Sequence, residues 1–210
     1  MIEFNAVTIK YVPDVTTLLN FNLKINGNTL IIGDEFLGTS SILRLLAKID
    51  KNYEGDIFIE GVNLKDIKDR DLSIAYIPKE PYLFNHKSIE KNLGYPLKIR
   101  KIDKATAKEK VNFALNLINN LTQKYNLPTF SNKINKMNIS EKKIITLLRA
   151  SLRTPKYILI DDFFINLNEK YQPLVAELIK QLEKTSTIIA TTSIITNLPY
   201  KNYKYIDLVN

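Results

Sequence analysis

The chain has 210 residues, of which 45% are apolar and 25% charged, and this balance is typical of a globular protein with a sizeable buried core. It contains no cysteine and one histidine, His86, which excludes disulfides, thiolate metal sites and clustered-histidine metal sites. The N-terminus shows no basic segment followed by an apolar one, and no apolar run approaches the roughly 20 residues that span a bilayer. We therefore expect neither a secretory signal nor a transmembrane helix, and an intracellular compartment is compatible with the composition.

The net charge of +8 is concentrated in one segment. Residues 87–143 hold 13 of the 30 Lys and Arg residues but only 4 of the 22 Asp and Glu residues. Such a segment either meets an anionic partner or forms solvated helix faces. Around Lys98, Arg100, Lys101 and Lys104 there is little beyond Tyr95 to stack on bases, so no nucleic-acid partner is expected.

The hydrophobic pattern predicts a mixed α/β protein. Residues 2–10 and 17–25 partly alternate apolar with polar, which favours antiparallel strands. A short apolar run at 29–33 ends in glycine, and helical spacing follows at 40–49. Further strands are expected at 56–60, 72–77, 156–161, 186–191 and 203–208, and helices near 104–120, 140–152 and 170–184. Strands that alternate with helices predict a mostly parallel sheet, and the strand-poor stretch 88–150 predicts an inserted helical subdomain.

The strand-to-helix turn at 33–41, GDEFLGTSS, has the outline of a phosphate-binding loop. Such a loop needs glycines that let backbone N–H groups face the phosphates, a lysine that neutralises them, and a hydroxyl for magnesium. Gly33, Gly38 and Ser40 stand at the glycine and hydroxyl positions, but Thr39 stands at the lysine position. Taken alone, this turn favours an ordinary strand-to-helix connection.

The order of the remaining motifs resembles the ATP-binding-cassette (ABC) transporter ATPase family from residue 2 to about residue 198. The longest matching stretch, residues 137–168, is similar to the family's run from the signature motif through the second acidic motif to the dimer-facing loop. Residues 55–67, 74–85, 92–102 and 187–194 resemble other family segments in the same order.

This resemblance implies a P-loop NTPase-like ABC cassette. Its fold class is α/β, with a mostly parallel core sheet, an N-terminal antiparallel β region and an inserted helical subdomain. We expect a single domain over residues 1–210, with the helical subdomain at about 88–150.

The resemblance also implies site residues. The nucleotide-binding positions are Tyr11, Gly33, Gly38, Thr39, Ser40 and Ser41. Ser40 and Asp161 are the positions that would hold Mg²⁺, and Asp162 occupies the place of the catalytic glutamate, one methylene shorter. Two alternatives stay open: Tyr11 contacts adenine or is a strand-surface aromatic, and the two aspartates hold metal or cap the turn that follows them.

Several family motifs are altered. Lys79 stands at the metal-contacting glutamine, Thr192 at the switch histidine, and 137–141 (MNISE) replaces a signature with a serine and two glycines. Lys79 either replaces the missing loop charge or is an exposed loop lysine. Asp34 and Glu35 add negative charge beside an anion site, and Phe36 stands where the family has a third loop glycine.

Loss of positive groups matters most, because phosphoryl transfer depends on positioning and on stabilising charge at the transferred group. We therefore expect binding of ATP and Mg²⁺ to be weak or lost, and a hydrolysis-deficient subunit that acts as a structural or regulatory partner in membrane transport. Two other functions stay open: an ATP-binding subunit with slow hydrolysis by Asp162, and a protein-binding scaffold unconnected with transport.

The resemblance further implies partners and location. Similar cassettes work in pairs, as homodimers or heterodimers, and dock on membrane-spanning transporter subunits through the helical subdomain. We therefore expect a cytoplasmic protein peripheral to the inner face of a membrane, where the basic segment is attracted to anionic headgroups.

Overall fold

The computed structural model describes residues 1–12, 15–33, 37–193, 199–200 and 202–208, and within these ranges the side chains of 10–12 and 15–17 are outside the description. The chain forms two compact units. Unit 1 comprises Met1–Tyr76, Lys156–Asp162 and Thr187–Asn210, and unit 2 comprises Ile77–Pro155 and Phe163–Ser186. Each unit is described by itself below.

Unit 1 contains the antiparallel sheet that the N-terminal alternation predicts. Its strands are ordered β2-β1-β4-β5, with bounds β1 Ile2–Val12, β2 Val15–Ile25, β4 Glu54–Ile59 and β5 Val62–Asn63. Gly55 in β4 has φ 83°, and a Cβ there would lie 2.4 Å from the carbonyl oxygen of Ala6 in β1. The two strands therefore approach each other at a point where only glycine fits.

The second sheet has the order β6-β7-β8-β3-β9. Its strands are β6 Ile74–Ile77, β7 Tyr157–Ile160, β8 Thr187–Thr192, β3 Thr29–Ile32 and β9 Lys204–Asp207. β3 pairs in parallel with β8 and β9, and β7 pairs in parallel with β8. All four residues of β7 are buried, as expected for a central strand of a covered parallel sheet.

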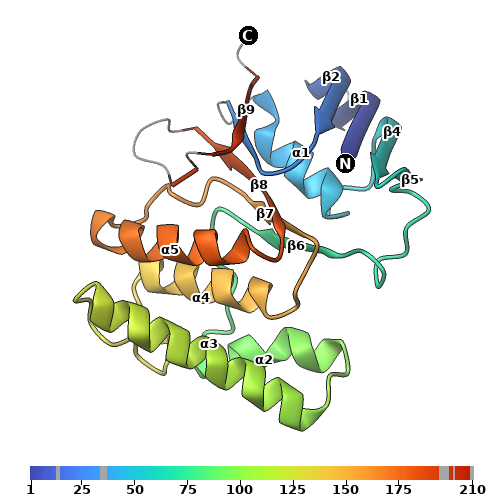
Figure 1. Cartoon of the computed structure of the whole chain (residues 1–210). Helices are drawn as coiled ribbons and strands as arrows, with labels where there is room; N and C mark the ends of the chain where they lie inside the picture. The colour runs from blue at the N-terminus through green and yellow to red at the C-terminus, as the bar shows by residue number, and fades with distance from the viewer. Residues whose placement is uncertain (13–14, 34–36, 194–198, 201, 209–210) are drawn as a thin grey trace. The chain divides into compact units, whose positions relative to one another are not determined.

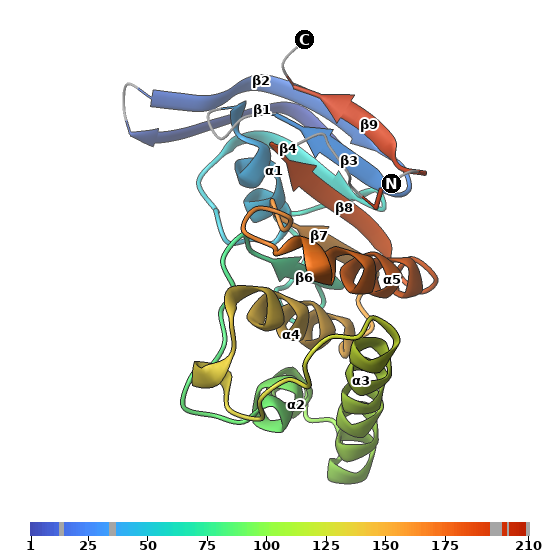
Figure 2. The ribbon, with the colours of Figure 1, turned by 90° about the vertical axis from the view of Figure 1, so that its left-hand side faces the viewer.

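The core of unit 1 lies around helix α1 (Thr39–Leu46), between the two sheets (Figure 2). Its apolar residues Ile42, Leu43, Leu45 and Leu46 have no exposed surface. They belong to one cluster with Phe4 and Ile57 of the antiparallel sheet and Leu159 and Ile189 of the parallel sheet. This packing fixes α1, and with it the loop that precedes α1.

Unit 2 is helical. Its α-helices are α2 Ile89–Ile99, α3 Lys104–Lys124, α4 Ile139–Ser151 and α5 Gln172–Leu182, with short 3-10 helices at Ile134–Lys136 and Glu169–Tyr171. The side chains of Ser88, Asp103 and Asn138 accept hydrogen bonds from the first turns of α2, α3 and α4. Figure 1 shows α3, α4 and α5 lying side by side.

The strands and helices expected from the sequence are present, with ends that differ by a few residues. α1 ends at Leu46 rather than at residue 49 because Lys48 adopts φ 55°, which no helix continues through. α2 was not separately expected, since it contains both Gly94 and Pro96. Among the described residues, no helix combines the length and the apolar character that a bilayer crossing requires.

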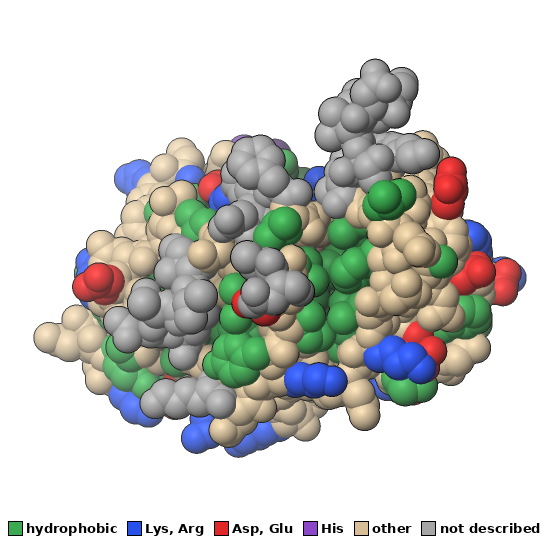
Figure 3. All heavy atoms as spheres, turned by 90° about the horizontal axis from the view of Figure 1, so that it is seen from above, with side chains coloured by type: hydrophobic (Ala, Val, Ile, Leu, Met, Phe, Trp, Pro, Cys, Tyr) green, Lys and Arg blue, Asp and Glu red, His purple; other side chains and the backbone are tan. Residues whose placement is uncertain are grey.

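Acidic and basic side chains are interspersed on the face of the molecule drawn in Figure 3, rather than gathered by sign. In the sequence, the excess of Lys and Arg over Asp and Glu lies in segment 87–143.

Candidate functional site

The loop between β3 and α1 has the backbone of a strand–turn–helix junction. The N–H of Gly33 donates to the carbonyl of Thr192 at 3.2 Å, which ties the end of β3 to β8. A Cβ at Gly33 would lie 3.0 Å from Cγ2 of Thr39 and 3.3 Å from Cδ1 of Leu37, so the turn is tight. Gly38 has φ 77° and directly precedes α1. Both predicted loop glycines therefore occupy positions that favour glycine.

The first residues of α1 carry hydroxyls but no charge. Thr39 and Ser41 are 5% and 6% exposed, and Ser40 is half-buried. An N-terminal helix turn attracts anions through its N–H groups, yet residues 37–41 supply no cation to reinforce it. Asp34, Glu35 and Phe36, which the sequence places in the same loop, lie outside the described residues.

Asp161 lies directly after β7 and is held by three hydroxyl groups. Ser40 Oγ and Thr191 Oγ1 donate to its Oδ1 at 2.8 and 2.9 Å, and Tyr76 Oη donates to its Oδ2 at 2.7 Å. Burial raises the pKa of Tyr76, and the neighbouring Asp161 carboxylate raises it further. Asp161 is 4% exposed, so these hydroxyls replace the water that a buried carboxylate loses.

Asp162 has a different environment. It adopts φ 42°, is 7% exposed, and its N–H donates to the carbonyl of Thr191 at 3.2 Å. Ser193 donates to its carboxylate twice, from Oγ to Oδ2 at 3.1 Å and from N to Oδ1 at 3.3 Å. The aspartate at the catalytic position is thus bonded to the residue after β8.

The structure brings together most of the predicted site residues of unit 1. Ser40 and Asp161 are hydrogen-bonded to each other, and Gly33, Gly38, Thr39 and Ser41 lie close to Ser40 in the sequence. The hydrogen bonds of Asp161 run to α1, β6 and β8, and none of them caps the turn that follows it, so the capping interpretation of Asp161 is wrong. Tyr11 belongs to β1, but its side chain is not described.

Sequence reasoning missed Tyr76, Thr191 and Ser193. All three lie in or beside the strands β6 and β8, and none of them was assigned a site role from the sequence. A signal was nevertheless present, because Tyr76 and Thr191 interrupt otherwise aliphatic strands, and a buried hydroxyl needs a partner.

The altered signature segment lies in unit 2. Asn138 caps α4: its Oδ1 accepts from the N–H of Glu141 at 3.0 Å, and Glu141 Oε2 accepts from the N–H of Asn138 at 3.1 Å. Tyr171 Oη donates to Glu141 Oε1 at 3.1 Å and accepts from Asn138 Nδ2 at 3.1 Å. Ser140 Oγ accepts from the N–H of Asn168 at 2.9 Å. The side chains of this segment are therefore engaged inside unit 2.

Lys79 also belongs to unit 2, where it is half-buried, so the description of it as an exposed loop lysine is wrong. Lys143 on α4 is 1% exposed and donates to the carbonyl of Phe163 at 2.8 Å. This bond joins α4 to the loop that precedes α5.

Comparison with known proteins decides the family. The family model described as "ABC transporter" matches residues 17–164, which is more than half of the chain. The chain belongs to the ABC transporter family. The expected family and fold class are thereby confirmed.

Individual relatives agree. The chain is 28% identical over 192 residues to the Fe(3+) ions import ATP-binding protein FbpC of Escherichia coli O157:H7, covering 89% of this chain and 52% of that protein. It is 29% identical over 197 residues to ABC transporter B family member 2 of Dictyostelium discoideum, covering 90% of this chain and 14% of that protein. The chain thus spans about half the length of the bacterial relative and a small part of the other.

A solved structure shares the fold. The dimeric, post-hydrolysis structure of the ATP-binding cassette MJ0796 bound to ADP and Pi superposes with a TM-score of 0.76 at 21% identity, covering 92% of this chain and 88% of that chain. Members of this family bind ATP together with Mg²⁺.

The residues fit that ligand in part. Ser40 and Asp161 supply the hydroxyl and the carboxylate that Mg²⁺ prefers. However, the same carboxylate accepts hydrogen bonds from three hydroxyls, and one of these hydroxyls belongs to Ser40. The loop also lacks the cation that a triphosphate requires. The residues present thus offer oxygen donors for Mg²⁺ but not the lysine charge of a complete phosphate-binding loop.

Proposed function

We propose that this chain is an ABC-type nucleotide-binding subunit associated with membrane transport that does not hydrolyse ATP and that acts as a structural or regulatory partner. The observation that carries the proposal is the uncharged Thr39 at the lysine position of the loop.

Electrostatics supports weak or lost binding of ATP and Mg²⁺. A unit charge roughly 4 Å from a phosphate charge is worth on the order of 4 kcal/mol at an effective dielectric near 20. Thr39 removes one such attraction, and Asp34 and Glu35 add negative charge in the same loop of the sequence. Even after screening by solvent, these changes oppose a triphosphate.

The signature segment supports the same proposal. In the family this segment completes the ATP site of a paired cassette. Glu141 lies in the first turn of α4, and its carboxylate accepts from the N–H of Asn138. The partial positive charge at the N-terminus of α4 therefore already has an anionic partner. A phosphate from a partner would compete with that carboxylate.

We further propose that the two units act as one cassette over residues 1–210, with residues 88–150 as its helical subdomain, on the cytoplasmic side of a membrane. Its partners are a membrane-spanning transporter subunit and a second cassette. A homodimer would contain two altered sites, which favours pairing with a cassette that retains its lysine. One relative is named as an Fe(3+) ions import ATP-binding protein, which is consistent with a role in transport.

A phosphate-release assay with ATP and Mg²⁺ tests the loss of hydrolysis. We expect the native chain to release phosphate no faster than Asp162→Asn, which keeps the size of the side chain but removes its charge. A clearly faster native rate would support the competing function, slow hydrolysis with Asp162 as the acting carboxylate, and would overturn the proposal.

A further inference from the structure

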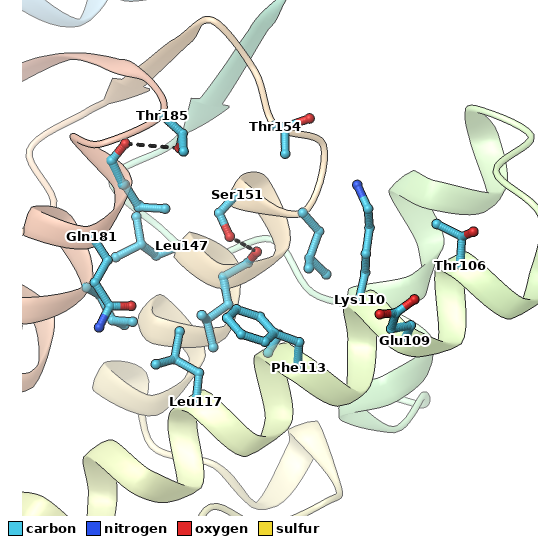
Figure 4. Close-up of a pocket in the computed structure, with 15 residues that line it drawn as sticks. Thr106, Glu109, Lys110, Phe113, Leu117, Leu147, Ser151, Thr154, Gln181 and Thr185 are labelled. Carbon is cyan, nitrogen blue, oxygen red and sulfur yellow. Dashed lines mark hydrogen bonds between the residues drawn. The ribbon is translucent and has the colours of Figure 1, made fainter.

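Unit 2 contains a pocket that no part of the proposed function uses. It has a volume of about 510 Å³ and is walled by α3, α4 and α5 (Figure 4). Sites for small molecules commonly occupy roughly 300 to 1,000 Å³. All of its lining residues belong to unit 2, so its shape depends on the packing of these three helices alone.

The body of the pocket is apolar. Its floor consists of side chains that are at most 7% exposed: Ala114, Leu147, Leu148, Leu152 and Leu178. Phe113 lies at the rim and is 68% exposed, and Figure 4 shows Phe113 and Leu117 extending from α3 toward α4. A large exposed aromatic ring beside buried leucines favours an apolar ligand, because covering it removes apolar surface from water.

Three of the hydroxyls that line the pocket donate to backbone carbonyls. Ser151 donates to the carbonyl of Leu148 at 2.7 Å, and Thr185 donates to the carbonyl of Leu182 at 3.3 Å. Thr154 donates to the carbonyl of Arg153 at 2.8 Å. The protons of these three hydroxyls are therefore engaged, and the buried body of the pocket offers apolar side chains to a ligand.

The lining of the pocket includes the basic residue Lys110. Lys110 is half-buried, and it makes no hydrogen bond or ion pair with any residue that the structure describes. In Figure 4 its side chain runs from α3 toward the segment that carries Thr154. The neighbouring Glu109 is exposed, whereas Lys110 is partly buried and lines the pocket.

We propose that this pocket binds a small anionic amphiphile, with a hydrocarbon chain on the buried leucines and Phe113 and a carboxylate beside Lys110. A concave pocket with walls from three helices can enclose a single hydrocarbon chain. A partner helix would instead need a long, flat apolar surface. The charge of Lys110 selects an anionic head over a neutral or cationic one.

Isothermal titration of the full chain with decanoate, below its micelle concentration, tests this site. We expect saturable binding of one decanoate per chain. Lys110→Gln weakens it roughly fivefold, which is the range of a partly exposed ion pair, whereas Lys108→Gln, at an exposed lysine outside the lining, leaves it unchanged. Decanol, which lacks the charge, binds native protein and Lys110→Gln with equal affinity.

A second variant tests the apolar wall. Phe113→Ala removes an exposed ring, so the chain still folds, and it weakens both decanoate and decanol, whereas Ile99→Ala, at a 64% exposed residue on α2, does not. The proposal is overturned if the native chain shows no saturable binding or if Lys110 and Phe113 variants bind as the native chain does. Binding of an amphipathic helical peptide in place of decanoate, or adsorption to anionic vesicles that Lys108→Gln weakens as much as Lys110→Gln, also overturns it.

Discussion

Asp161 is a buried carboxylate that depends on hydrogen bonds from individual side chains. A buried carboxylate costs several kcal/mol unless hydrogen bonds or a counter-charge compensate it. Here Ser40, Tyr76 and Thr191 provide that compensation from three different elements. The cluster therefore joins α1, β6 and β8 at the end of β7.

Removing one of these donors is expected to destabilise the fold. Tyr76→Phe leaves Asp161 Oδ2 without its hydroxyl donor, and a charged acceptor left unsatisfied costs about 1–3 kcal/mol. Urea denaturation measures the change in the free energy of unfolding. Tyr82→Phe is the control, because Tyr82 is 75% exposed, and an equal effect of the two variants would contradict the role given to Tyr76.

Glu60 gives a pH-dependent prediction. The N-terminal ammonium, 2.9 Å from its Oε1, together with the hydroxyl of Tyr157 and the ammonium of Lys156, lowers the pKa of Glu60 from 4.5 to about 2. A lowered pKa stabilises the fold above the unfolded-state value, and this contribution is lost as the pH falls from 4.5 toward 2. The side chain is 44% exposed, so solvent screening keeps the contribution small.

Glu60→Gln checks this linkage. We expect the variant to be less stable than the native chain at pH 6, and the difference in the free energy of unfolding to shrink as the pH is lowered to 3. A difference that stays constant over this range would show that ionisation of Glu60 does not contribute.

At the scale of elements, the sequence predicted most strands because hydrophobic alternation and short apolar runs depend on local pattern alone. Helix α2 escaped prediction because Gly94 and Pro96 lie inside it. Its capped first turn, with Ser88 accepting from the N–H of Lys91, compensates for these residues in part. Likewise, the partners of Asp161 escaped because Tyr76 and Thr191 reach it only once β6, β7 and β8 are side by side.

The contact of β1 with β4 yields a matched pair of variants. Gly55 and Gly61 have φ 83° and 79°, so alanine at either position meets about 1 kcal/mol of left-handed strain. At Gly55 the added Cβ also meets Ala6 O at 2.4 Å, whereas at Gly61 nothing lies within 4 Å. We expect Gly55→Ala to cost about 1–3 kcal/mol more than Gly61→Ala in a denaturation experiment. Equal costs would mean that the strand contact relaxes freely.

At the scale of the whole molecule, the order of motifs along the chain predicted the family, and the family model confirms it. A solved cassette shares the fold. The contacts of the site residues were harder to predict from the sequence than the family. The missing loop lysine is visible at Thr39 in the sequence, but the hydroxyl partners of Asp161 and the hydrogen bonds of the signature segment inside unit 2 depend on tertiary contacts. A retained fold with altered charges is the basis of the proposed function.

Titration with a fluorescent ATP analogue and Mg²⁺ tests that proposal most directly. The native chain is compared with a variant that carries Thr39→Lys, Asp34→Asn and Glu35→Gln, which restores the loop charge and removes the opposing ones. We predict no binding by the native chain below millimolar nucleotide and a clear gain in the variant. Micromolar binding by the native chain would contradict the electrostatic account of this site.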